Sequence, residues 1–229
     1  SLILTLEKLE NKNIKYYEEV LSLCGVAFQS WSHFVVNYLP KLYYYEKLIK
    51  ENNLVLIVPF TKDKNIIEMI DYFVSSSFGG NVSIRYIKRN EYIHCKKLHY
   101  IENFSKISDH SESCYNYSVI IPSIVPITLR NIVKELSTKL KTKSLEYEKL
   151  YIRRGSHTRS LINSKEIESL FVEKGYHILE CNNLSIEDKI RFFSGATHIV
   201  GELSSAFTNI IFCNSKNLNI LGFINYSRC

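Results

Sequence analysis

Three short segments of the sequence combine residue types that can carry out group-transfer chemistry. In the first, 151–159, Arg153 and Arg154 follow an apolar run that predicts a strand. Arginine guanidinium groups form paired hydrogen bonds with phosphate oxygens, so a strand that ends in two arginines suits a small phosphorylated ligand. The alternative is an ordinary solvated basic loop, which the residues alone leave open.

The second segment, 195–209, connects another predicted strand to an apolar helix. Ser204 and Ser205 stand at its turn, and Thr208 and Asn209 follow in the helix. Backbone N–H groups and hydroxyls at such a turn can bind a diphosphate, with the helix dipole behind them. The two serines are equally consistent with ordinary helix caps. Neither a Gly-x-Gly-x-x-Gly fingerprint nor a Walker lysine is present, so a dinucleotide site and a P-loop are not predicted. Glu202 would repel a phosphate here unless it binds sugar hydroxyls or takes a proton.

The third segment, 29–42, begins a predicted helix and places His33 near its start, between Trp31 and Asn37. An imidazole at a helix start that faces a cleft can act as a general base near neutral pH. From these residues alone, a packed histidine without a catalytic role is the more common outcome.

Apolar runs and helical patterns alternate along almost the whole chain. The predicted strands are 21–28, 54–58, 82–87, 97–101, 117–121, 150–153, 176–179, 197–200 and 218–221. The predicted helices are 32–50, 64–76, 127–141, 164–174, 185–194 and 204–213. Such alternation predicts an α/β protein with parallel sheets covered on both faces. We place the domain boundary near Pro126, which gives Rossmann-like domains at 1–125 and 126–229 with a cleft between them.

The composition of the 229 residues indicates which classes of binding partner to expect. The net charge of +6 favours small anions such as phosphates. The sequence contains no basic run interleaved with aromatic residues, so nucleic-acid binding is not predicted. No apolar run approaches the roughly 18 residues of a membrane span, and we expect no signal peptide. From Ser1 in place of methionine, we expect either a trimmed sequence or a piece of a longer chain.

Six cysteines without C-x-x-C pairs predict free thiols in a reducing, cytoplasmic compartment. His94, Cys95, His99, His110 and Cys114 contain the residue types of a zinc site. Structural zinc ligands usually come in tight pairs across a short turn, which these residues lack, so we expect no metal.

Taken in order, the three segments resemble glycosyltransferase family 61 over roughly residues 25–221. The first part of the resemblance reads Trp31-Ser-His33-Phe-x-x-Asn37-x-Leu-Pro40-Lys41-Leu. The second is the strand end Tyr-Ile-Arg-Arg at 151–154, and the third extends from 184 to 212. The chain departs from the family pattern at Asn37, where an acidic residue is usual, and at 203–204, where Leu-Ser replaces His-Gly. The turn, with Glu202 after the glycine and Ser-Ala following, resembles bacterial and viral-type variants.

The resemblance implies a GT-B fold and an inverting, metal-independent transfer from a nucleotide-diphosphate sugar to a hydroxyl of a glycan or glycoconjugate. Family members include eukaryotic xylosyl- and N-acetylglucosaminyltransferases and bacterial capsule or lipopolysaccharide enzymes. No cofactor is expected beyond the nucleotide sugar. The alternative is a catalytically silent nucleotide- or sugar-binding domain of a larger assembly.

Roles for individual residues follow from the same resemblance. The catalytic base would be His33 or, as second candidate, Glu202. The donor and its phosphates would be bound by Arg153, Arg154, Ser204, Ser205, Thr208 and Asn209. The acceptor side would comprise Trp31, Asn37 and Lys41.

Overall fold

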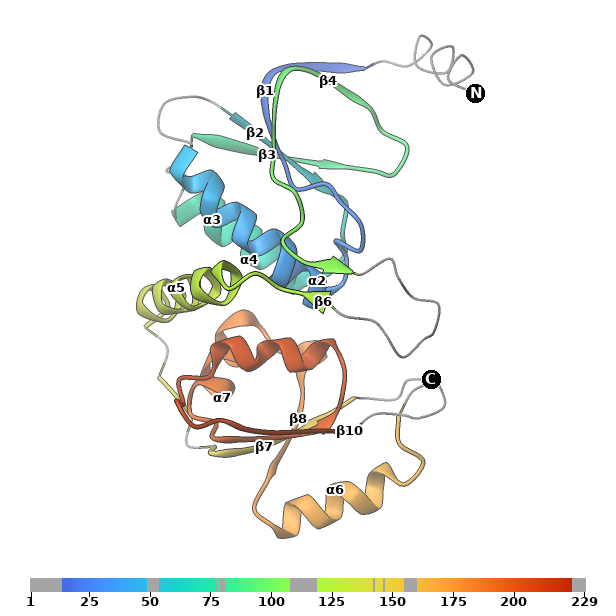
Figure 1. Ribbon diagram of the computed structural model, residues 1–229, viewed down its shortest axis with the longest axis vertical. Helices are drawn as coiled ribbons and strands as arrows, with labels where there is room; N and C mark the ends of the chain where they lie inside the picture. Colours follow the sequence, from blue (N-terminus) through green and yellow to red (C-terminus); the bar gives the residue numbers. More distant parts are fainter. Residues whose placement is uncertain are drawn as a thin grey trace. The chain divides into compact units, whose positions relative to one another are not determined.

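The computed structural model describes residues 14–48, 54–76, 78, 81–107, 119–141, 143–145, 147–154 and 160–223. The described residues form two compact units (Figure 1). The first unit is built from residues within 1–29 and 37–103, and the second from residues within 30–36 and 104–229. The domain boundary predicted between residues 125 and 126 stays a prediction.

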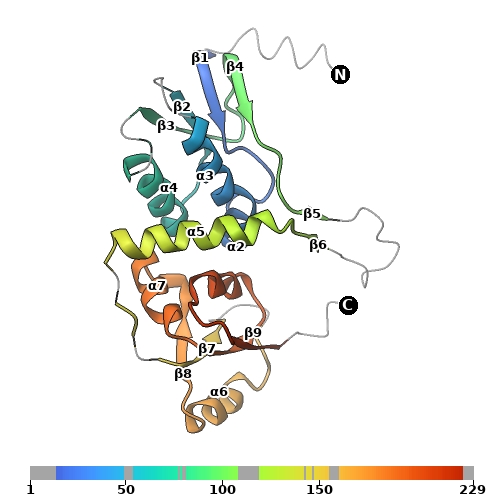
Figure 2. The ribbon, with the colours of Figure 1, turned by 60° about the vertical axis from the view of Figure 1, so that its left-hand side comes forward.

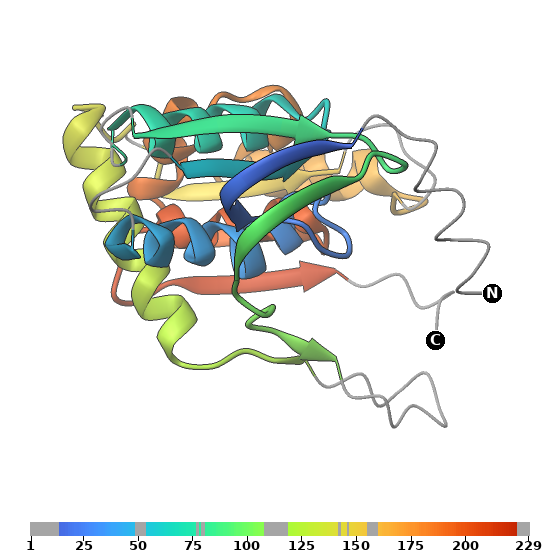
Figure 3. The same ribbon diagram turned by 90° about the horizontal axis from the view of Figure 1, so that it is seen from above.

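The first unit contains a four-stranded sheet in the order β3-β2-β1-β4, with every neighbouring pair parallel. Its strands are β1 (Lys15–Ser22), β2 (Leu54–Pro59), β3 (Val82–Ile87) and β4 (Ile93–Tyr100). β1 and β4 lie side by side along their whole length (Figures 2 and 3). The chain proceeds from β1 to β2 and β3 on one side and then returns to the other side of β1. This reversal of strand order is the hallmark of Rossmann-like sheets.

A long helical segment precedes β2. It consists of the short helix α2 (Trp31–His33), the π-helix η1 (Phe34–Tyr38) and α3 (Leu39–Leu48). The predicted helix 32–50 is therefore confirmed over its described residues, 32–48, but the stretch Phe34–Tyr38 is π-helical. Pro40 explains the difference, because proline has no N–H to donate and its ring clashes with the carbonyl four residues earlier in an α-helix. The wider π turn accommodates it. α4 (Lys64–Ser76), between β2 and β3, agrees with the prediction.

The second unit contains another four-stranded parallel sheet, in the order β10-β9-β7-β8. Its strands are β7 (Lys149–Arg153), β8 (His177–Glu180), β9 (His198–Glu202) and β10 (Asn219–Phe223). All four were predicted to within two residues, because each is a short apolar run bounded by polar residues or glycine. The predicted α/β class with parallel sheets is thus confirmed.

Helices cover both faces of this second sheet. Figure 1 shows α6 (Ser164–Glu173) on one face, and α7 (Ile186–Ser194) with the 3₁₀-helix η3 (Ser205–Phe212) on the other. α5 (Ile124–Lys139) packs against η3. A short 3₁₀ turn, η2 (Cys181–Asn183), follows β8. The buried core between sheet and helices includes Leu150, Ile152, Ile190, Phe193, Ile199 and Phe212.

Several predicted elements differ from the structure. The predicted strand 97–101 begins earlier, as β4, and the predicted helix 204–213 is the 3₁₀-helix η3. The predicted strand 21–28 is wrong beyond Ser22, because the chain turns there: Cys24 N–H donates to Ser22 Oγ and Ala27 adopts a φ of 58°. Of the predicted strand 117–121, residues 117 and 118 lie outside the described ranges, and the strand in the described part is β6 (Val119–Ile120), which pairs antiparallel with β5 (Lys106–Ile107).

The predicted helix 127–141 begins earlier than expected, at Ile124. Pro126 lies in the first turn of this helix, where backbone N–H groups have no partner within the helix, so proline is tolerated.

Candidate functional site

The second sheet has a topological switch point between β7 and β9. From β7 the chain moves to β8 on one side and then crosses to β9 on the other, with α6 and α7 on opposite faces. In such sheets ligands bind outside the carboxyl ends of the strands where the order reverses. Two of the three sequence segments, at 153–154 and 201–205, lie at this edge. The structure therefore brings these predicted residues together.

Gly201 allows the two strands to meet closely at this edge. Its φ is +152°, and a Cβ at this position would lie 2.2 Å from the carbonyl oxygen of Ile152 on β7. Real Cβ atoms do not approach an oxygen so closely, so only glycine fits without moving one strand.

Glu202, the last residue of β9, is buried, with 3% of its surface exposed. Its Oε2 accepts a hydrogen bond of 3.0 Å from the backbone N–H of Leu161. Burial, together with the nearby Glu202 and Glu168 carboxylates, raises the pKa of Tyr151 to about 12. The Tyr151 hydroxyl is buried and has no hydrogen-bond partner among the described residues. Through its bond with the Leu161 N–H, Glu202 holds the residues just before α6 at the carboxyl edge of the sheet.

Arg153 is already engaged in an ion pair. Its Nε and Nη2 donate to the two carboxylate oxygens of Glu168 on α6, at 2.9 and 2.5 Å. The carboxylate of Glu168 raises the pKa of Arg153, and Glu180, its partner in the register of β8, adds to this effect. A diphosphate would have to compete with these carboxylates for the guanidinium. The predicted phosphate role of Arg153 stays a prediction.

Arg154 faces the turn after β9. Its Nη1 donates to the carbonyl oxygen of Leu203 at 3.4 Å, a long hydrogen bond, and no ion pair engages Arg154 among the described residues. Ser204 caps η3, because its Oγ accepts from the N–H of Ala206 at 3.3 Å. The helix-cap interpretation of Ser204 is confirmed, whereas Ser205 is exposed and Thr208 half-buried. Their contacts with a donor stay predictions.

Asn209 and Trp31 form one buried unit. The indole Nε1 of Trp31 donates to Asn209 Oδ1 at 2.9 Å, and Asn209 is completely buried. Lys189 of α7 places its ammonium group 4.6 Å from the centre of a Trp31 ring, at a distance typical of cation–π contacts. These contacts fix α2, and with it the half-buried His33, against η3 within the second unit.

Lys189 was not among the residues predicted for the site. The signal was present, because Ile186, Lys189, Ile190 and Phe193 follow the helical i, i+3, i+4, i+7 spacing and all four are buried. A lysine within an apolar stripe must have a partner for its charge. Here the Trp31 ring provides such a partner.

Lys41 and Asn37, both predicted on the acceptor side, are buried in the first unit, with 0% and 3% of their surfaces exposed. Lys41 Nζ donates to Asn103 Oδ1 at 2.9 Å and lies 4.9 and 5.2 Å from the ring centres of Tyr38 and Tyr100. Burial lowers its pKa to about 8. Tyr100 is the last residue of β4, and Asn103 follows it in the chain. Both lie near the carboxyl ends of β1 and β4, where the strand order of the first sheet reverses.

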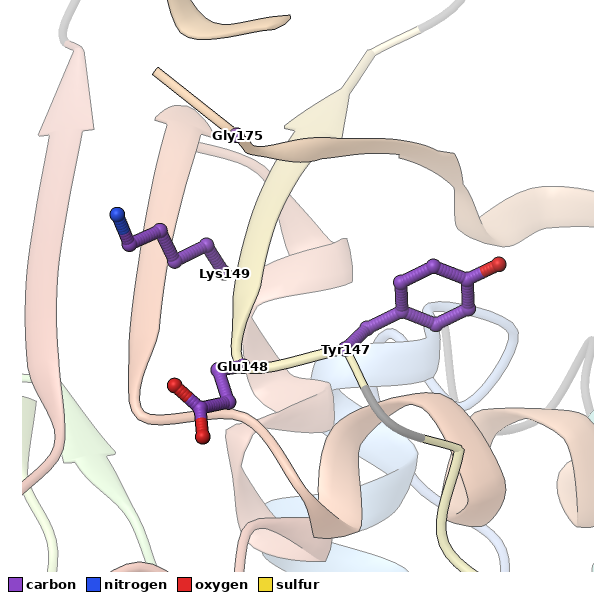
Figure 4. Close-up of a pocket in the computed structure, with 4 residues that line it drawn as sticks. All are labelled: Tyr147, Glu148, Lys149 and Gly175. Carbon is purple, nitrogen blue, oxygen red and sulfur yellow. The ribbon is translucent and has the colours of Figure 1, made fainter.

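A cavity of about 260 Å³ opens at the opposite edge of the second sheet (Figure 4). It is lined by Tyr147, Glu148, Lys149 and Gly175, where β7 begins. This cavity is separate from the switch point, because the strands run from this edge toward Glu202.

Two further findings concern metals and membranes. Within the described ranges, no three His, Cys, Asp or Glu residues are grouped as metal ligands would be. His110 and Cys114 lie outside these ranges. None of the described helices has the length and apolar character needed to cross a membrane.

Comparison with known proteins agrees with the resemblance described above. The family model Glycosyltransferase 61 matches residues 31–220, which include every candidate residue named here. No curated protein was found to match the sequence. Since the match covers most of the chain, the protein belongs to glycosyltransferase family 61 and is a glycosyltransferase.

Proposed function

We propose that the protein transfers a sugar from a nucleotide-diphosphate donor to a hydroxyl of a glycan or glycoconjugate, with inversion at the anomeric carbon. The acceptor oxygen forms a bond to the anomeric carbon as the bond to the diphosphate breaks. The nucleoside diphosphate departs with the electron pair of that bond, and a base takes the hydroxyl proton. The observation that carries the donor part is the position of Arg154 and the cap of η3 at the switch point.

The departing diphosphate gains negative charge, which fixed hydrogen-bond donors can stabilise. In the proposed complex, the guanidinium of Arg154 and the first N–H groups of η3 bind it. Arg153 contributes only if it exchanges its bond with Glu168 for one with phosphate. Glu202 is buried on β9 and one of its oxygens is already bonded to Leu161 N–H, which favours a structural or sugar-contacting role over proton transfer.

His33 is the proposed base. It is half-buried, and it follows Trp31 in a helix that Asn209 and Lys189 hold in place. An imidazole side chain can accept a proton from a hydroxyl near neutral pH. In this proposal the two units form a GT-B arrangement, with donor bound by the second and acceptor by the first. Each unit having its own parallel sheet supports this arrangement.

Donor binding is tested by titrating the protein with a panel of nucleoside diphosphates. Arg154→Ala should weaken the best ligand by about 10-fold or more, the loss expected for a charge-assisted hydrogen bond, while nucleosides without phosphate are unaffected. Lys165→Ala, which removes an exposed charge from α6, is the matched control. Unchanged affinity in Arg154→Ala would contradict the proposed phosphate site. If the wild-type protein binds the nucleotide but turns over no donor, the silent binding domain is the better description.

Arg153→Ala distinguishes two roles for that residue. If Arg153 also binds phosphate, this substitution should weaken the binding free energy of the nucleoside diphosphate by about 1.5 to 3 kcal/mol. A loss of stability alone would assign it to its contact with Glu168.

We also propose that transfer needs no metal ion, because arginine and helix N–H groups supply the positive charge. Activity should persist in a chelator. Activity that is lost in chelator and restored by Mn²⁺ or Mg²⁺ would contradict this proposal.

A further inference from the structure

A second cavity, of about 500 Å³, lies between α5 and the end of η3. Arg130 and Lys134 of α5 line one side, and Lys216 lines the other. Val133 and Ile211 contribute apolar surface, and hydroxyl and amide side chains complete the wall. The volume is within the range of small-molecule sites, which combine apolar walls with a few polar groups.

Among the described residues, the positive charge of this cavity has no acidic partner. None of the described residues that line it is an aspartate or glutamate. Arg130 and Lys134 are four residues apart on α5, so their charges lie on one helix face and repel each other. No ion pair involves Arg130, Lys134 or Lys216 in the part of the chain that the structure describes. A bound anion would relieve this repulsion.

The cavity is distinct from the proposed donor site. η3 begins beside Glu202 at the carboxyl edge of the second sheet, and β10 begins at Asn219, paired with His198 at the start of β9. The segment from Cys213 to Lys216 therefore lies toward the amino edge. The five residues of β9 separate the two edges by roughly 13 Å at about 3.3 Å per residue.

We propose that this cavity binds a phosphate group of a small molecule, at a site separate from the donor diphosphate. The three cations bind the phosphate oxygens, and the side chains of Val133 and Ile211 contact the organic part of the ligand. A purely solvated basic surface is the competing explanation, and it predicts only weak, salt-sensitive binding.

Titration with inorganic pyrophosphate at about 0.15 M salt tests the proposal. The wild-type protein should bind at two sites. Arg154→Ala should weaken binding at the donor-edge site alone by about 10-fold or more, and the double charge reversal Arg130→Glu/Lys134→Glu should weaken binding at the other site by about 10-fold or more. Lys165→Glu reverses one exposed charge on α6, the same change as in Lys216→Glu, and should alter neither site. If the double variant does not fold, Lys216→Glu, in the loop after η3, replaces it.

Labelling of Cys213 locates the second site. This thiol lines the cavity, and burial raises its pKa to about 12, so it should react slowly with maleimide. Pyrophosphate should slow its labelling, read by mass spectrometry, at least fivefold in the wild-type protein and not in the double variant. If pyrophosphate binds once only, at the Arg154 site, and does not protect Cys213, this inference is wrong while the proposed function stands. If pyrophosphate protects Cys213 but Arg154→Ala does not change pyrophosphate binding, the second site stands and the proposed donor site is wrong.

Discussion

The buried ammonium group of Lys41 should make stability depend on pH in a predictable way. Lys41 is completely buried, and its pKa is about 8 in the folded protein, against an ordinary value of 10.5. The folded protein therefore releases this proton more easily than the unfolded chain does. Stability contributed by this group is lowest below pH 8, rises between pH 8 and pH 10.5, and levels off above that range.

The size of the effect follows from these two pKa values. The charged lysine costs about 3 kcal/mol of stability at pH 7. About 1 kcal/mol of this is recovered by pH 9, and roughly 2 to 3 kcal/mol by pH 10. Tyr45 and Tyr151, whose pKa values burial raises to about 12, act in the opposite direction as the pH rises. Lys41→Met keeps these tyrosines and removes only the titrating ammonium group.

The assay is urea unfolding of the wild-type protein and Lys41→Met at pH 7, 8, 9 and 10. The difference in unfolding free energy between the two proteins should shift by about 1 kcal/mol in favour of the wild type from pH 7 to pH 9. Any constant packing effect of methionine, including the loss of the bond to Asn103, leaves this slope unchanged. A difference that stays constant across this range would refute the lowered pKa of Lys41.

Two further substitutions test the geometry of the second unit. Gly201→Ala should destabilise the protein by more than about 3 kcal/mol, because its Cβ would collide with the Ile152 carbonyl, whereas Gly175→Ala, at a φ of +80° with open space around it, should cost only about 1 kcal/mol. Thermal unfolding measures both, and equal shifts would refute the close approach of β7 and β9. Trp31→Phe leaves the buried Oδ1 of Asn209 without its donor and should cost about 1 to 3 kcal/mol in urea unfolding. An unchanged midpoint would mean that this bond contributes nothing.

The sequence predicted the second sheet better than the beginning of the first. β7 to β10 are short apolar runs, and their positions could be read from hydrophobicity alone. β1 was misplaced because its exposed half carries polar residues such as Lys15 and Glu18, while the apolar residues continue past its end at Ser22. The turn at Ala27 depends on tertiary packing around Gly25, where a Cβ would lie 2.4 Å from the Tyr38 hydroxyl oxygen.

For the candidate site, the sequence likewise predicts which residues lie at strand ends but not which partners they contact. The sequence placed Arg153, Arg154 and Glu202 at strand ends, and parallel topology then brings those ends together. It could not show that Arg153 pairs with Glu168, because that choice depends on how α6 packs on the sheet. Nor could it show that Trp31 bonds to Asn209, which is 178 positions away in the chain. Such partners are set by tertiary structure and not by local pattern.

Steady-state kinetics of sugar transfer by the wild-type protein, His33→Ala and Glu202→Gln test the central claim most directly. Once an accepted donor is identified, His33→Ala should lower kcat by about 100-fold or more with nucleotide affinity unchanged, as expected for the loss of a general base. Glu202→Gln should mainly raise the donor KM. If Glu202→Gln abolishes turnover while His33→Ala remains active, the base is on β9 and the assignment proposed for His33 is wrong.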